Sequence, residues 1–100
     1  MNIEYLTLKV LWFIYEAKGA GVFRFTKAEF IRAYYTMQRQ GKIPKLKIES
    51  LLRKLRDLAS RGNIIRYADY RGGVYYCDSS MLTIALKQFE GSYKRYDQKQ

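Results

Sequence analysis

The chain has 100 residues, of which 48% are apolar, so it is expected to form one small domain with a buried core. Its 19 Lys and Arg residues against 9 Asp and Glu give a formal net charge of +10, which favours a polyanionic partner, nucleic acid before an anionic membrane. The chain has no His and one Cys, which excludes a histidine base and argues against a zinc site. With no nucleotide-binding glycine motif and no spaced pair of carboxylates, we expect no cofactor and no enzyme activity.

The first predicted helix spans residues 3–17, with Asn2 as its N-cap and Gly19 at its end. Apolar residues occupy nearly its whole circumference, so more than the domain core must cover it. The second covering element is either another subunit or the C-terminal helix. After the Gly-Ala-Gly break, residues 22–25 are expected to be a short extended segment.

A second helix begins at a capping box, in which the Thr26 side chain and the Glu29 side chain each bond to the other's backbone amide. Phe25 and Phe30 occupy the two positions of a hydrophobic staple around this box. The helix is expected to run to about Arg39.

The third predicted helix covers residues 44–61, with Pro44 in its first turn and Gly62 at its end. Its leucines recur at helical spacing. The segments 63–68 and 74–77 are β-branched and Tyr-rich and flank a Gly-Gly bend, which predicts a β-hairpin.

A last helix is expected from Met81, capped by Ser79 or Ser80. Its apolar residues alternate at spacings of four and three and form a seam that requires a partner helix. This seam consists of Leu82, Leu86, Phe89, Tyr93 and Tyr96. Residues 91–100 are expected to be the helix end and a frayed basic tail.

The predicted order is helix, short strand, helix, helix, two-stranded hairpin, helix. The most informative residues are Leu51, Leu55, Leu58, Arg61, Gly62, Ile64, Ile65, Val74, Tyr75 and Tyr76. In this order and at these positions the chain resembles the winged helix-turn-helix family of DNA-binding proteins. The resemblance implies an α+β, mostly helical fold in residues 1–90, with a three-helix core, a two-stranded β wing and an extra C-terminal helix. The Lys, Arg and Tyr content without His is also similar to small regulators of hyperthermophilic archaea and their viruses.

The positive charge is clustered, because residues 38–61 contain eight Lys and Arg against two carboxylates, whereas residues 1–20 have no net charge. In the resembled family the third helix enters the major groove. There we expect Arg53 to read a base, Glu49 and Ser50 to add polar contacts, and the wing tip to touch the DNA backbone. The predicted DNA-binding residues are Lys45, Lys47, Glu49, Ser50, Arg53, Lys54, Arg56, Arg66, Tyr70 and Arg71. For each charged residue the alternative is an ordinary solvated side chain.

The many tyrosines allow two interpretations. Tyr34, Tyr35, Tyr67, Tyr75 and Tyr76 could form a stacking platform for single-stranded nucleic acid. We favour the alternative, in which these rings belong to the core and their hydroxyls reach its rim.

The favoured function is sequence-specific binding of double-stranded DNA by a homodimeric transcription regulator, with no small-molecule ligand. The predicted dimer interface comprises Leu8, Trp12, Tyr15, Leu82, Leu86, Phe89 and Tyr93. Two alternatives remain open: a winged-helix module that docks a protein partner, and a non-specific nucleic-acid binder.

The expected location is cytoplasmic, either on the nucleoid or, for a viral protein, in the host cytoplasm. A lone cysteine, Cys77, cannot form an intrachain disulfide, and no signal peptide is evident. We expect this cysteine to be buried, with an intermolecular disulfide as the less favoured alternative. The longest apolar run, residues 10–15, is too short to span a bilayer, so no membrane partner is expected.

Overall fold

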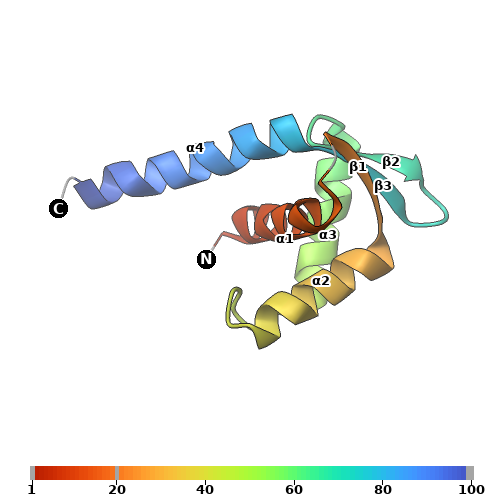
Figure 1. The fold of residues 1–100 in the computed structure, drawn as a ribbon, viewed down its shortest axis with the longest axis horizontal. Coiled ribbons are helices and arrows are strands. Elements are labelled where there is room, and N and C mark those ends of the chain that lie inside the picture. Colours follow the sequence, from red (N-terminus) through yellow and green to blue (C-terminus); the bar gives the residue numbers. More distant parts are fainter. Residues whose placement is uncertain (1, 20, 99–100) are drawn as a thin grey trace.

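The computed structural model describes the backbone of residues 2–19 and 21–98, and the side chains of this part as far as residue 91. The described residues form an α+β fold of four helices and a three-stranded antiparallel sheet (Figure 1). Its elements are α1 (Ile3–Lys18), β1 (Val22–Thr26), α2 (Lys27–Arg39), α3 (Ile48–Arg61), β2 (Ile65–Asp69), β3 (Val74–Asp78) and α4 (Ser79–Gln98). None of these helices has the length and apolar character needed to cross a membrane.

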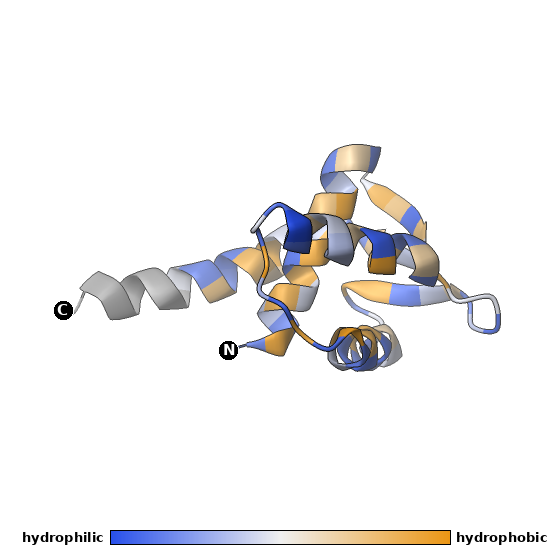
Figure 2. Ribbon diagram, turned by 90° about the horizontal axis from the view of Figure 1, so that it is seen from below, coloured by the Kyte–Doolittle hydropathy of each residue, from blue (hydrophilic) through white to orange (hydrophobic). Residues whose placement is uncertain are grey.

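Helix α1 lies at the centre of the fold and packs against α2, α3 and α4 (Figure 1). Leu8, Val10 and Leu11 are completely buried along it. The nearly all-round apolar surface of this helix is therefore covered largely by helices of the same chain. Figure 2 shows the apolar segments meeting in the middle of the body, whereas the projecting tip of the β2–β3 hairpin is hydrophilic.

The predicted ends of α1 and the start of α2 are confirmed. The Tyr5 amide donates to Asn2 Oδ1 over 3.1 Å, and Gly19 closes α1 with a positive φ of 65°. At α2 both hydrogen bonds of the capping box between Thr26 and Glu29 are present, each 3.1 Å long. The two N-caps satisfy amides that the helix itself leaves unpaired, and the Gly19 amide donates to the carbonyl of Tyr15.

The predicted start of α3 at Pro44 is wrong, because the helix begins at Ile48. The Leu46 amide donates to the buried Tyr34 hydroxyl over 2.7 Å, and this hydroxyl donates to the Leu46 carbonyl over 2.8 Å. Ile43 is also buried and fixes the beginning of this loop. Because the Tyr34 hydroxyl of α2 bonds to the amide and the carbonyl of Leu46, these groups do not take part in a helical turn.

The predicted cap of α4 is also wrong, since Asp78 caps the helix in place of Ser79 or Ser80. Its Oδ1 atom accepts from the amides of Ser80 at 2.9 Å and Met81 at 3.3 Å. The Ser79 hydroxyl and amide donate instead to the carbonyl of Gly21, at 2.6 and 2.8 Å, and tie the start of α4 to the start of β1.

The predicted hairpin is confirmed, and β1 adds a third strand to it in the order β1-β3-β2. Because strands alternate, one face of the sheet packs on the core and the other faces outward. The core face carries Phe23, Phe25, Ile65, Tyr75 and Cys77. Cys77 has no exposed surface, and burial raises the pKa of its thiol to about 12.

The seam predicted along α4 has its partner helix in the same chain. Leu82 is fully buried and Leu86 is 9% exposed, and α4 packs against α1. The Phe89 ring lies 5.6 Å from the Tyr5 ring of α1. The side chains of Tyr93 and Tyr96 are not described. Residues 91–98 of the predicted tail form the last turns of α4, and residues 99–100 lie outside the described residues.

The α2 capping box predicts a pH-dependent stability. The hydrogen bond from Lys18 lowers the pKa of Glu29, and the hydrogen bond from the Thr26 amide lowers it further, although partial burial acts to raise it. A carboxylate whose pKa is lowered in the folded state stabilises the fold at pH values above its ordinary pKa. This stabilisation is lost as the pH falls through the lowered pKa. Glu29→Gln keeps the box geometry and removes the charge, so we expect a lower melting temperature at pH 7 and no difference from wild type in acid.

Melting temperatures measured by circular dichroism between about pH 7 and pH 2.5 check this expectation. Glu49→Gln, which removes an exposed carboxylate from α3 that has no ion pair among the described side chains, is the matched control. The difference between its melting temperature and that of the wild type should not narrow as the pH falls. An equal gap for Glu29→Gln at both ends of the pH range would contradict the proposed charge effect.

Candidate nucleic-acid interface

The outward side of α3 carries a positive ridge. The helix buries Leu51, Leu55 and Leu58 against the core, and since it has 3.6 residues per turn, Arg53 lies on the opposite side. Arg56 is also exposed and lies beside Arg53, toward the hairpin. Exposed Glu49, Ser50 and Ser60 complete this outward side.

A network of ion pairs binds the other flank of α3 to the start of α1. Arg61 lies 3.3 Å from Glu4 and 2.8 Å from Asp57, and Lys54 lies 3.8 and 3.5 Å from the same two carboxylates. Such exposed pairs add little stability, but they neutralise the two cations locally. Lys54, which is one of the predicted DNA-binding residues, is therefore paired within the chain.

The remaining predicted cations differ from Lys54 in this respect. Among the side chains that the structure describes, no ion pair involves the cations predicted to contact DNA apart from Lys54. These cations are Lys45, Lys47, Arg53, Arg56, Arg66 and Arg71. All six are exposed, so their charge is available to an external anion.

Three cations from three elements meet at a shallow hollow of about 230 Å³ between α3 and the hairpin. They are Lys27 at the start of α2, Arg56 on α3 and Arg71 at the hairpin tip. Tyr67, Tyr70 and Tyr75 line the same hollow, and none of its lining residues is acidic. This arrangement of guanidinium, ammonium and hydroxyl groups suits a phosphate oxygen.

Lys27 is a residue that the sequence analysis missed. Its amide donates to the Gly73 carbonyl over 2.8 Å, and this bond holds the base of the hairpin against the start of α2. Gly73 adopts a positive φ of 64°, which favours glycine at this bend. The sequence carried no signal for this contact, because the two residues are distant along the chain.

The hairpin separates Arg66 from the other predicted contacts. Tyr67 faces the hollow, so its neighbour Arg66 points to the outer face of the sheet. There its guanidinium carbon lies 5.5 Å from the centre of the Tyr76 ring. The predicted wing contact therefore divides into two sites, with Tyr70 and Arg71 on the α3 side and Arg66 on the outer face.

The loop before α3 places Lys45 and Lys47 beside the ridge. Its position depends on the Tyr34 hydroxyl, which bonds to both backbone groups of Leu46 between the two lysines. At Lys47, the N-cap position of α3, no side-chain hydrogen bond is present. Contacts with α2 therefore replace a local capping signal at the start of this helix.

Tyr34→Phe tests this role of the hydroxyl. The variant removes one partner of the Leu46 amide and carbonyl, and unsatisfied buried groups of this kind cost about 1–3 kcal/mol of stability. Urea unfolding followed by circular dichroism measures the loss. Tyr35→Phe, at a ring that is 42% exposed, is the control and should leave the stability unchanged. Equal unfolding midpoints for the two variants would show that the hydroxyl does not fix the loop.

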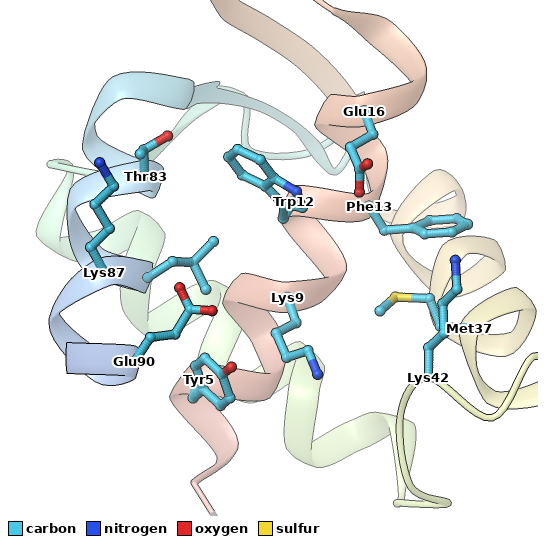
Figure 3. Close-up of a pocket in the computed structure, with 11 residues that line it drawn as sticks. Tyr5, Lys9, Trp12, Phe13, Glu16, Met37, Lys42, Thr83, Lys87 and Glu90 are labelled. Carbon is cyan, nitrogen blue, oxygen red and sulfur yellow. The ribbon is translucent and has the colours of Figure 1, made fainter. Parts of the chain in front are cut away.

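A second surface lies on α1 between α2 and α4, where a groove of about 530 Å³ opens (Figure 3). Tyr5, Lys9, Trp12 and Glu16 follow one stripe of α1 at spacings of four, three and four. In Figure 3 the Trp12 ring points toward α4, while Phe13 lies on the α2 side.

This groove contains only part of the predicted dimer interface. Leu8 and Leu82 are completely buried by their own chain, and Leu86 nearly so, which removes the first two from any surface that a second subunit could reach. Trp12, Tyr15 and Phe89 are partly exposed. Tyr93 lies outside the described side chains.

No group of acidic residues and Cys77 that could hold a metal ion occurs in the described part of the chain. No protein-family model, curated protein or solved structure matches this chain. The charges and geometry of α3 and the hairpin are therefore the basis on which a function can be proposed.

Proposed function

We propose that this chain is a winged helix-turn-helix protein that binds double-stranded DNA and regulates transcription. The observation that carries the proposal is the convergence, on one side of the molecule, of cations that form no ion pair among the described side chains. Arg53 and Arg56 of α3, Lys27 of α2 and Arg71 of the hairpin contribute to it. The element order and the β1-β3-β2 sheet are consistent with this family's layout.

In the proposed complex, α3 enters the major groove and the hairpin follows the adjacent backbone. Arg53 reads a guanine through its two acceptors, and Glu49 and Ser50 contact neighbouring base edges. The hollow formed by Lys27, Arg56 and Arg71 holds a phosphate and fixes the position of α3 in the groove. Regulation then follows from occupancy of the site, with no chemistry on the DNA.

Arg53→Ala combined with Arg56→Ala tests this proposal. We expect at least a tenfold loss of affinity for a selected duplex, because a bidentate base contact alone contributes about 1–3 kcal/mol. The salt dependence, measured as the slope of log K against log salt concentration, should decrease by about one to two. Fluorescence anisotropy titrations with a labelled duplex at several salt concentrations measure both quantities.

The matched control is Arg32→Ala combined with Arg39→Ala, which removes two exposed arginines from α2 and gives the same net charge. The control should keep most of the affinity. Equal losses in the two double variants would mean that net charge alone drives binding, as in a non-specific binder, and absence of duplex binding by the wild type at low salt would end the proposal.

We further infer a homodimer formed through the groove side of α1 and α4. Trp12 offers partly exposed apolar surface there, and Lys9 and Glu16 lie on the same stripe of α1. Phe89 lines a separate hollow with Ile3 and Lys54. A two-fold axis that pairs antiparallel α1 helices places Lys9 of each copy near Glu16 of the other. Two α3 helices would then read half-sites about one DNA turn apart, ~34 Å.

Trp12→Glu should dissociate this dimer by placing a charge in its apolar centre. Light scattering should give twice the chain mass of 11.9 kDa for the wild type and the single chain mass for the variant. Tyr35→Glu, at an exposed ring of α2, is the control and should remain dimeric. A wild type that scatters as a monomer at about 100 µM contradicts the dimer without affecting the duplex proposal.

The same groove supports a second candidate function, a module that docks a different protein. Its aromatic floor and mixed charges resemble the core of an interface between proteins. This candidate is favoured if the wild type is monomeric and the arginine variants of α3 do not change duplex affinity.

A further inference from the structure

The outer face of the sheet carries a row of side chains that the proposed duplex site does not use. Arg24 on β1 pairs with Tyr76 on β3, and Tyr76 pairs with Arg66 on β2. All three side chains are exposed, and Tyr76 retains 37% of its surface. The prediction that its ring belongs to the core is therefore wrong. Since side chains directly opposite each other on one face lie ~5 Å apart at Cβ, the three form one continuous strip.

This strip combines positive charge with an aromatic ring. The Arg66 guanidinium carbon lies 5.5 Å from the centre of the Tyr76 ring, within cation–π distance. No ion pair of Arg24 or Arg66 occurs among the described side chains. Asp78, which lies on the same face of β3 as Tyr76, accepts hydrogen bonds from two amides of α4 at its Oδ1 atom.

An apolar side chain extends the strip along β1. Val22 lies two residues before Arg24, on the same face of the strand, and 53% of it is exposed. The opposite face of the sheet is filled by core residues, so the strip and the α3 ridge belong to different surfaces. The structure therefore separates two positively charged surfaces, the strip on the outer face of the sheet and the ridge of α3 with its adjoining hollow.

We propose that this strip, Arg24–Tyr76–Arg66, binds single-stranded nucleic acid. An unpaired base stacks on Tyr76 or on the Arg66 guanidinium plane, and the two arginines hold the phosphates on either side of this nucleotide. The two outer strands are ~10 Å apart, which leaves room for one nucleotide between the arginines. A duplex cannot use this strip in the same way, because its bases are paired and stacked within the helix.

The proposal goes beyond duplex binding and does not depend on it. Single-stranded DNA and single-stranded RNA share the bases and phosphates that the strip would recognise. Parallel titrations with labelled oligo(dT) and oligo(U) of 12 nucleotides distinguish these two sources.

The experiment measures fluorescence anisotropy with these oligonucleotides and with a duplex, for wild type and three variants. Arg24→Gln combined with Arg66→Gln removes the phosphate contacts, and Tyr76→Ile removes the ring while keeping strand propensity. Tyr76→Phe retains the ring. Melting temperatures by circular dichroism verify that each variant is folded.

We expect single-strand affinity to fall about tenfold in the double-Gln variant and in Tyr76→Ile, and to be retained in Tyr76→Phe. The loss in Tyr76→Ile should persist at high salt, because stacking is not screened as phosphate contacts are. Duplex affinity should change less than about threefold in these three variants.

Arg53→Gln combined with Arg56→Gln is the matched control, since it removes two exposed arginines from the other surface. It should weaken duplex binding and leave most of the single-strand affinity. The proposal is overturned if sheet variants bind single strands as the wild type does, or if the α3 variant alone loses them. Failure of duplex binding with intact single-strand binding would contradict only the duplex proposal.

Discussion

The fold depends on the enclosure of α1, a helix that is apolar over nearly its whole circumference. Helices α2, α3 and α4 all pack against it, and Leu8, Val10 and Leu11 are removed from water completely. Burial of this much apolar surface is the main favourable term available to a small domain. It also decides the orientation of α3, because the leucines of this helix must turn toward α1 and its arginines must then turn away.

Local signals in the sequence were sufficient for most element ends, since a cap is a contact between residues three or four positions apart. The α2 capping box and the Gly62 end of α3 belong to this class, and both are present. The start of α3 was misplaced because a hydroxyl twelve residues away occupies the backbone of Leu46. Asp78 was overlooked as a cap because the helix was predicted to begin at Met81, whereas it begins two residues earlier, at Ser79.

For the candidate site, composition located the charge but not its availability. Glu4 neutralises Lys54 and Arg61 from fifty or more residues away, which no helical pattern in residues 44–61 could reveal. Lys27 joins Arg56 and Arg71 only because the hairpin folds back onto α2. The position of Arg66 was predictable in principle. Successive residues of a strand point to opposite faces of the sheet, so Arg66 and Tyr67 must lie on different faces.

Cys77 has a consequence for how two copies of this chain can associate. It lies in the central strand of the sheet, facing the core, and its thiol resists ionisation. Thiolate is the species that attacks a disulfide or an oxidant. We therefore expect that oxidation does not crosslink folded copies through Cys77. A covalent dimer on a non-reducing gel would come from molecules that had unfolded. A disulfide-linked dimer would thus indicate that Cys77 had become exposed by unfolding.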